Sequence, residues 1–305
     1  MNPASRFPAS HPSLWRVAAG RLLCLVLTIL LAAFLAAALV RLSPGFGMDE
    51  RQLDARLSDR SIRAIQAEYG GAQSVLAYFW SYLAALTRGD LGQSLSLGRP
   101  VRELLWERFG VTLQSAAGGL AWAWIAAAGA CLSLGMVGMA GMVRRRIFDS
   151  AAMTLSGAML CLPAAIVGLF SFYLGAGPAL AIGAILLPRV FRYIRNVTGA
   201  IARRPHVLAA RARGAGGLGL LARHVWLPAA PELMALAGVS VSMALGAAIP
   251  VEALCDSPGI GQLVWKAALA RDVPVLVNVT ILIATVTAVA NLLADAGRSA
   301  FQREA

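Results

Sequence analysis

The sequence has little charge, and this shortage defines the broad class of the protein. Only 14% of the 305 residues are Asp, Glu, Lys or Arg, whereas 58% are hydrophobic and the mean hydropathy is +0.69. A soluble domain carries about 25% charged residues. The composition therefore predicts an integral membrane protein rather than a soluble domain.

Cysteine and histidine are also scarce, and several catalytic patterns are missing. The four cysteines, Cys24, Cys131, Cys161 and Cys255, include no C-x-x-C pair, and the three histidines form no ligand pattern. This spacing disfavours a zinc site and a disulfide framework. The chain also lacks a Walker A sequence, a Ser–His–Asp arrangement and paired carboxylates within a span. We therefore expect no enzyme activity, no cofactor and no bound metal.

The chain does contain a series of long apolar runs. A spanning helix needs about 20 apolar residues, and these runs are close to that length or longer. An all-α fold with about six transmembrane helices is predicted, over residues 22–40, 111–143, 151–188 as two spans around the turn Gly175–Pro178, 233–251 ended by Pro250, and 275–293.

The first apolar run carries small residues at positions 36–38, a pattern typical of a signal-peptide cleavage site. A signal h-region is usually about 7–15 residues, and this run is longer, so an uncleaved anchor is preferred. The predicted organisation has three parts: residues 1–42 (N-terminal tail and first transmembrane helix), 43–110 (extracytoplasmic segment) and 111–305 (the core with a cytoplasmic loop, 189–232).

The basic charge of the chain orients these spans. The N-terminus, the loop at 144–146, the loop at 189–232 and the C-terminus together hold sixteen arginines and four acidic residues, a net charge of +12. The other side holds eleven residues of each sign. Cytoplasmic loops carry an excess of Lys and Arg, so both termini are predicted to be cytoplasmic. The charge is thus a topology signal, and a nucleic-acid partner is not expected.

The predicted cytoplasmic loop 189–232 contains helical patterns. Residues 189–204 place Val190, Phe191, Ile194, Val197 and Ile201 on one helical face and arginines on the other, as in an amphipathic or interfacial helix. Pro205 suits the first turn of a further helix, and Gly214 suits its end. A second short helix is predicted over residues 220–227.

Residues 214–219 spell G-x-G-x-x-G, the pattern of a dinucleotide-binding loop. That site needs a preceding strand and an acidic residue about 20 positions further on. Here a helical segment precedes the glycines, and the only nearby acid, Glu232, is 13 positions past Gly219. A turn between two helices is therefore the preferred interpretation.

Four blocks of the sequence resemble one family. "AARARG", residues 209–214, resembles the cytoplasmic loop of binding-protein-dependent ABC importer permeases. "GDLGQSLSLGRPVRELLWERF" (89–109), "VEALCDSPGIGQLVWKAALARDVPVL" (251–276) and "NLLADAG" (291–297) resemble segments of the B-type permease of the dipeptide, oligopeptide and nickel branch. "RLSPG" (41–45) resembles that subunit's first external turn.

This resemblance implies an ABC importer type I permease fold in the bacterial cytoplasmic (inner) membrane. It implies a second homologous permease, two ATP-binding subunits and an extracytoplasmic solute-binding protein as partners. Residues that would couple to an ATP-binding subunit are Ala209, Ala210, Arg211, Ala212, Arg213 and Gly214. Arg211 and Arg213 could instead serve only the positive-inside bias.

The sequence departs from the family at four points. The loop lacks the family's glutamate, the segment after Gly214 is "AGGLG" instead of a charged turn, "GAGP" replaces a longer external segment, and "SPGFG" (43–47) lacks the acid of the family's first external turn. Because glycine costs about 1 kcal/mol relative to alanine in a helix, a loose coupling loop is expected.

A second group of candidate residues lies where the fifth predicted span meets the outer side: Pro250, Glu252, Pro258, Gly259 and Gly261. An acid near a membrane boundary suggests a gate or a contact for a substrate amine. A solvated helix end is an equal alternative. Asn291 and Asp295 share a helix face, for which a structural role is preferred.

The predicted function is import of short peptides or a related small solute, such as a nickel chelate, driven by ATP hydrolysis on a separate subunit. Two alternatives stay open. A secondary transporter or channel would work without ATP but needs an acid within a span, for which only Asp295 is available. A degenerate permease could assemble as a scaffold without transporting.

Overall fold

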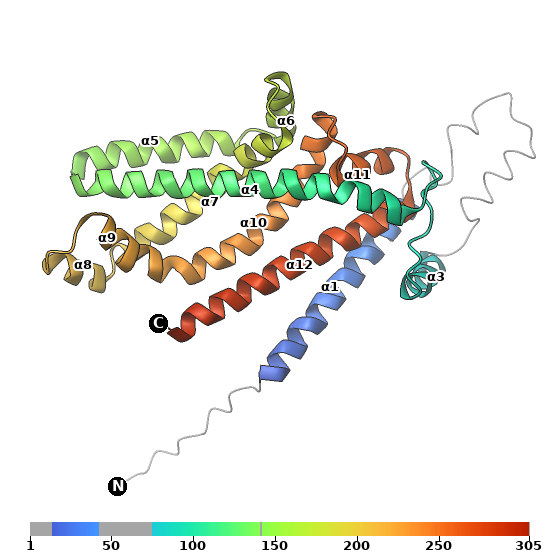
Figure 1. The fold of residues 1–305 in the computed structure, drawn as a ribbon, viewed down its shortest axis with the longest axis horizontal. Coiled ribbons are helices and arrows are strands. Elements are labelled where there is room, and N and C mark those ends of the chain that lie inside the picture. The colour runs from blue at the N-terminus through green and yellow to red at the C-terminus, as the bar shows by residue number, and fades with distance from the viewer. Residues whose placement is uncertain (1–13, 43–74, 141, 305) are drawn as a thin grey trace, which may run out of the picture.

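The computed structural model describes residues 14–42, 75–140 and 142–304. Within these ranges the chain consists of helices joined by turns and short connections, with one isolated bridge between Gln93 and Pro100, which confirms the all-α prediction. The helices are α1 (Leu14–Leu42), α3 (Val75–Thr87), α4 (Val101–Ala140), α5 (Met142–Leu160), α6 (Ala164–Tyr173), α7 (Pro178–Ile201), α8 (Pro205–Ala212), α9 (Gly217–Leu221), the π-helical η2 (Ala222–Trp226), α10 (Leu227–Leu254), α11 (Ile260–Leu269) and α12 (Val273–Glu304) (Figure 1).

Each predicted span corresponds to a helix or a bent pair of helices. In the described part of the chain, three segments are long and apolar enough to cross a membrane, Val101–Met136, Gly217–Leu254 and Val273–Phe301, and the bent pair α5–α6 adds a fourth if the two helices cross as one span. The remaining two predicted spans correspond to α1, with a shorter apolar helix at Leu23–Ala36, and to α7, whose second half carries three arginines.

Several predicted boundaries were wrong because proline does not end these helices. Pro188 is buried inside α7, so the predicted interfacial helix at 189–204 is the second half of that long helix. Pro250 lies inside α10, which continues to Leu254. Proline is tolerated in membrane helices because packing against neighbours stabilises the continued helix. At the other end of the core, α4 starts at Val101, so the last ten residues of the predicted extracytoplasmic segment are helical.

The two spans predicted within 151–188 are not a simple hairpin. The turn at Gly175 is present, with a φ of 65°. Pro178 is the first residue of α7, a position that suits proline. However, the chain also bends by 92° between α5 and α6, where Pro163 precedes the first turn of α6. The residue before a proline disfavours the helical conformation, which accounts for the break that the hydropathy pattern does not reveal.

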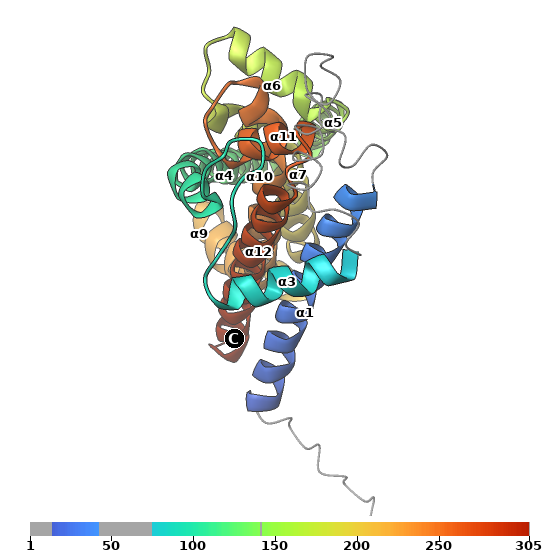
Figure 2. The same ribbon diagram turned by 90° about the vertical axis from the view of Figure 1, so that its right-hand side faces the viewer.

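The core forms where α4 packs against α7, and α10 packs against both. Small residues allow α4 and α7 to approach closely: a Cβ on Gly119 would lie 2.6 Å from the carbonyl oxygen of Ala179, and one on Gly183 would lie 2.4 Å from Trp122. Helix α12 packs against α10 and α1. Figure 2 shows α3 and α11 at one end of this bundle, and α8 and α9 lie at the other.

Candidate functional site

The helix α8 projects at one end of the bundle and stops at a glycine. Pro205 lies in its first turn, and Gly214 follows its last turn with a φ of 89°. The Gly214 N–H donates to the Arg211 carbonyl at 2.9 Å, and the Ala215 N–H donates to the Ala210 carbonyl at 3.0 Å. This pair of bonds is the Schellman motif, so the predicted helix and its glycine stop are both confirmed.

The inner face of α8 packs against the rest of the protein. Val207 and Ala210 are buried in a cluster with Val197 and Ile201 of α7, Leu220 and Leu221 of α9, Val225 of η2 and Ala229 of α10. The His206 Nε2 also lies 3.2 Å from the His224 carbonyl oxygen. We call residues 205–226 the coupling knob, after the role predicted for residues 209–214. Its base is thus attached to α7 and, through η2, to α10.

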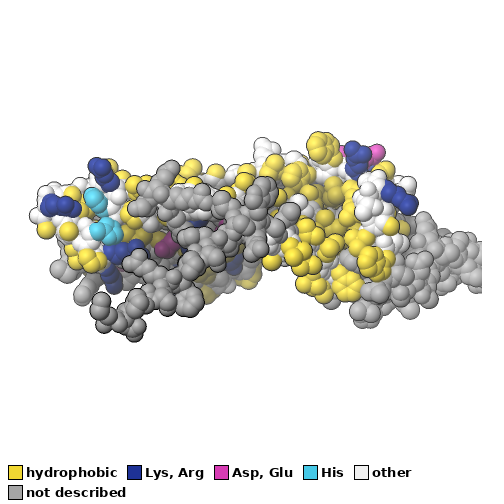
Figure 3. Space-filling view, turned by 90° about the horizontal axis from the view of Figure 1, so that it is seen from below, with side chains coloured by type: hydrophobic (Ala, Val, Ile, Leu, Met, Phe, Trp, Pro, Cys, Tyr) yellow, Lys and Arg dark blue, Asp and Glu magenta, His cyan; other side chains and the backbone are white. Residues whose placement is uncertain are grey.

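The outer rim of the coupling knob is exposed. Of the six residues predicted to couple, five face solvent, namely Ala209, Arg211, Ala212, Arg213 and Gly214, whereas Ala210 belongs to the buried base. Figure 3 shows arginine and histidine side chains gathered at this end of the molecule. The rim therefore combines small side chains with positive charge.

The glycine run has a backbone role in the knob. A helix, α8, precedes it in place of the strand that a dinucleotide site requires. Gly217 has a φ of 65°, and the extended Gly216 precedes the first turn of α9. The predicted separate helix at 220–227 was wrong: α9 and η2 continue directly into α10, with Pro228 in its first turn. The π-helical η2 lies directly before Pro228, and a local π adjustment of this kind allows helical structure to continue across a proline.

At the other end of the bundle, Glu252 is fully buried, so its interpretation as a solvated helix end was wrong. Its Oε2 accepts hydrogen bonds from Thr112 Oγ1 at 2.9 Å and from the Gly261 N–H at 2.8 Å, and its Oε1 accepts one from Ser115 Oγ at 2.9 Å. The Ile260 N–H donates to Thr112 Oγ1 at 2.7 Å. We call this network the Glu252 node.

The Glu252 node explains why glycines occupy the motif after α10. A Cβ on Gly259 would lie 2.1 Å from the Glu252 Oε2, and a Cβ on Gly261 would lie 2.5 Å from the Ala248 carbonyl oxygen. The carboxylate therefore lies against the N-terminal turn of α11, where the helix dipole stabilises a negative charge. Of the predicted gate residues, Glu252, Gly259 and Gly261 come together, whereas Pro258 lies exposed in the connecting turn.

Thr112 and Ser115 of α4 were not predicted as partners of Glu252. Their signal is a pair of hydroxyls three residues apart, just after the charged first turns of α4, where the helix becomes mostly apolar and polar side chains usually face the bundle interior. The partner itself could not be identified, because 137 positions separate Ser115 from Glu252 in the chain.

A second buried acid, Asp272, holds the segment before α4 against the start of α12. Its Oδ2 accepts hydrogen bonds from Ser94 Oγ at 2.6 Å, Ser96 N–H at 3.0 Å and Ser96 Oγ at 2.8 Å. Its Oδ1 accepts from the Val275 N–H at 3.3 Å, as an N-cap does. The sequence blocks 89–109 and 251–276 are therefore in contact, which the sequence did not reveal. Of the block at 41–45, residues 43–45 lie outside the described residues.

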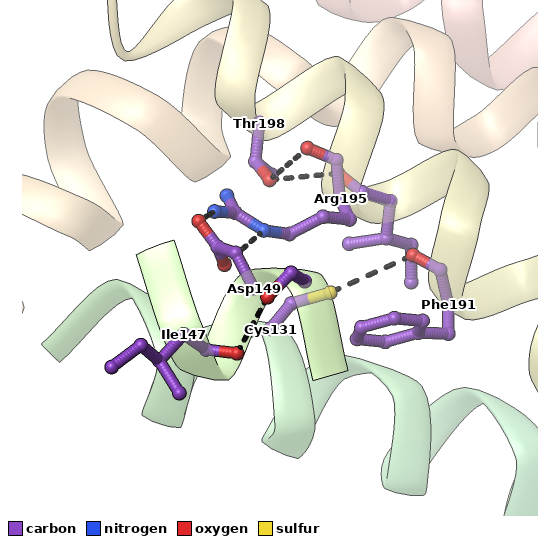
Figure 4. Close-up of polar contacts among 8 residues, drawn as sticks. Cys131, Ile147, Asp149, Phe191, Arg195 and Thr198 are labelled. Atoms are coloured by element: carbon purple, nitrogen blue, oxygen red, sulfur yellow. Dashed lines mark hydrogen bonds and ion pairs between the residues drawn. The ribbon is translucent and has the colours of Figure 1, made fainter. Parts of the chain in front are cut away.

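Near the coupling knob, α5 and α7 are joined by an ion pair. Arg195 donates from Nε to Asp149 Oδ1 at 3.1 Å and from a terminal nitrogen to Oδ2. Figure 4 shows this pair beside Cys131 of α4, whose thiol lies 3.7 Å from the Phe191 carbonyl oxygen. Cys131 is buried, where a free thiol behaves as a small hydrophobe, and all four cysteines are free.

Comparison with known proteins places this architecture in a family. Residues 131–304 match the family described as "Binding-protein-dependent transport system inner membrane component". The chain is 24% identical to the nickel import system permease protein NikB of Staphylococcus aureus (strain MRSA252) over 291 residues, 90% of this chain and 87% of that protein. It is 28% identical to the glutathione transport system permease protein GsiC of Salmonella choleraesuis (strain SC-B67) over 297 residues, 90% of this chain and 94% of that protein.

The helical bundle, the apolar spans and these similarities agree with the motifs seen in the sequence. The chain therefore belongs to the family of binding-protein-dependent transport system inner membrane components, and it is a permease of the ABC importers in the peptide and nickel branch.

Proposed function

We propose that this chain is one of two permease subunits of an ATP-driven importer that moves short peptides, or a related small solute such as a nickel chelate, into the cytoplasm. Its partners are a second homologous permease, two ATP-binding subunits and an extracytoplasmic solute-binding protein. The chain itself hydrolyses no ATP. Both termini and the coupling knob lie on the cytoplasmic side, which agrees with the net charge of +12 on that side.

The observation that supports this function most directly is the construction of the coupling knob. Its exposed rim, Ala209 and Arg211–Gly214, presents small side chains and two guanidiniums to a partner. Its base is buried against α7 and continues through η2 into α10. Movement of an ATP-binding subunit that holds the rim would therefore be transmitted to two helices of the bundle.

The solute class rests on the names of the two relatives, which concern nickel and glutathione import. Glutathione is a tripeptide, so both names agree with a small polar solute. Alternating access between the two permeases would expose such a solute first to the outer side and then to the cytoplasm.

The first test is to purify the tagged chain gently from its native membrane and to record a native mass spectrum. A complex with a second permease and two ATP-binding subunits is expected. A chain that runs alone or as a homo-oligomer, under conditions that preserve known assemblies, would contradict the importer and favour the secondary transporter or channel.

The second test separates a working coupling knob from a scaffold. Gly214→Pro places a residue restricted to φ near −65° where the backbone has a φ of 89°, and Arg211→Glu reverses a charge on the rim. Both variants are expected to assemble but to lose ATP-dependent uptake in proteoliposomes. Arg88→Glu makes the same charge change at the opposite end and serves as control. Uptake that persists in both rim variants would contradict coupling through the knob, and uptake without ATP would indicate a secondary transporter.

A further inference from the structure

A cleft of about 760 Å³ lies beside the coupling knob, where α5, α7 and α8 meet. Its lining includes Asp149 and Met153 of α5, Arg195 of α7, Arg203 after the end of α7, and Leu208 and Arg211 of α8. The cleft therefore joins the end of two core helices to the helix that forms the rim of the knob.

The charge of this cleft is positive and only partly neutralised. Among its described lining residues are three arginines and one acid, Asp149, which accepts two hydrogen bonds from Arg195 (Figure 4). Arg203 and Arg211 are exposed, and neither forms an ion pair with any residue that the structure describes. Two arginines without a described ion-pair partner, one on each side of the junction between α7 and α8, therefore line the same cleft.

The remaining lining fits a ligand that is only partly polar. Gly199 and Ala200 of α7 leave room beside the arginines. Leu208 is 54% exposed, and Met153 adds a second apolar side chain to the wall. A small inorganic anion would use the guanidiniums but would leave these apolar side chains uncovered, whereas an amphipathic anion would use both.

The position of the cleft along the bundle favours a lipid. Asp149 and Met153 lie at the start of the apolar segment Ile147–Leu160, which forms part of a candidate membrane span. The cleft therefore lies where the apolar part of α5 meets the polar end of the molecule. Basic pockets between helices at the cytoplasmic boundary of a membrane bind the phosphates of anionic lipids.

We propose that this cleft binds the phosphate headgroup of an anionic phospholipid from the cytoplasmic leaflet, with the phosphate between Arg203 and Arg211. The proposal rests on the orientation given under the proposed function. A bound phosphate ties α8 to the end of α7, so the lipid fixes the position of the coupling knob. Coupling of ATP hydrolysis to uptake then depends on the anionic lipid content of the membrane.

The test uses the whole importer in nanodiscs of phosphatidylcholine with increasing phosphatidylglycerol. Native mass spectrometry counts the retained phosphatidylglycerol, and a photoreactive phosphatidylglycerol identifies the labelled peptides. The double variant Arg203→Gln/Arg211→Gln is compared with Arg223→Gln, which removes an exposed arginine of η2 outside the cleft lining. Loss of two phosphate contacts is expected to weaken phosphatidylglycerol binding roughly 20- to 30-fold.

The expected result is that phosphatidylglycerol labels α5, α7 and α8, and that only the double variant loses this labelling. Equal retention in both variants would overturn the site, because it would show general attraction to basic residues. If inorganic phosphate prevents photolabelling of the cleft while the number of retained phosphatidylglycerol molecules stays the same, the cleft would be assigned to a free anion. Loss of the ATP-binding subunits from the double variant, with lipid retention unchanged, would assign it to an acidic surface of that partner.

These outcomes are distinct from failure of the importer itself. If no ATP-binding subunit accompanies the unmodified chain, the proposed function fails, and the lipid measurement can still be made on the chain that is recovered. If the complete importer is recovered but phosphatidylglycerol does not label the cleft, only the lipid site is overturned.

Discussion

The coupling knob and the Glu252 node lie at opposite ends of the bundle and use charged residues in opposite ways. In the knob Val207, Leu220 and Val225 are buried, and the guanidiniums of Arg211 and Arg213 face solvent. In the node the carboxylate of Glu252 is fully buried and accepts hydrogen bonds from two hydroxyls and a backbone N–H. The first arrangement leaves charge available to a partner, whereas the second uses charge to join α4, α10 and α11.

This difference distinguishes two residues whose sequence contexts are similar. Arg211 and Glu252 both lie in blocks that resemble the family, and both are charged residues near a membrane boundary. The surroundings of Glu252 leave no room for a solute on the oxygen that faces Gly259. We therefore expect changes at the node to affect folding, and changes at the rim to affect coupling.

The largest effect is expected from Gly259→Ala. The added Cβ would lie 2.1 Å from Glu252 Oε2 and 2.6 Å from Thr112 Oγ1, and overpacking of this kind costs about 3 kcal/mol. The midpoint of thermal unfolding of the purified chain should fall clearly. Gly246→Ala is the matched control, because no atom lies within 4 Å of its added Cβ. An equal midpoint for the two variants would show that the node is not rigid.

Glu252→Ala is expected to cost about 3 kcal/mol, because the Gly261 N–H and two hydroxyls lose their acceptor in a buried site. Glu252→Gln keeps the shape and one acceptor oxygen, and hydroxyls can turn to accept from its amide, so it should cost only about 1 kcal/mol. Thermal unfolding and the KM for uptake should be measured together. A stable Glu252→Gln variant whose KM rises strongly would instead support the gate or substrate-amine hypothesis.

A smaller effect is expected from Gly214→Ala at the end of α8. Alanine at a φ of 89° is strained by about 1 kcal/mol, and this strain acts only on the Schellman turn. Uptake per ATP hydrolysed should fall a few-fold while assembly and thermal unfolding stay unchanged. Gly219→Ala, in helical α9 with open space around its Cβ, should have no such effect. Equal coupling in the two variants would contradict a defined turn at Gly214.

The smallest effect is expected from Arg99→Gln, which removes an ion pair at the surface. The Arg99 guanidinium donates to Glu107 at 2.6 Å, and this hydrogen bond together with the charge of Glu107 raises the pKa of Arg99. Both side chains are about half exposed, and such pairs contribute little. Thermal unfolding should not change measurably at moderate salt. A clear loss of stability would mean that this exposed ion pair stabilises the fold as strongly as the buried hydrogen bonds of the Glu252 node.

The sequence alone was sufficient for the class of the protein and for the local form of the knob. Low charge and long apolar runs predict a membrane protein because the cost of burying charge in lipid is a property of each residue. Pro205 and Gly214 predict the start and end of α8 because their backbone preferences act within a single turn. The buried face of α7, including Val190, Ile194 and Ile201, also followed from periodicity.

Only the tertiary structure decided which polar groups meet. Glu252 with Thr112, and Asp272 with Ser94, are joined across 140 and 178 positions of the chain, and no local preference links such residues. The continuation of α7 past Pro188 and of α10 past Pro250 was likewise decided by packing. A residue's preference acts over a few neighbours, whereas burial and hydrogen bonding depend on helices that come together only when the bundle forms.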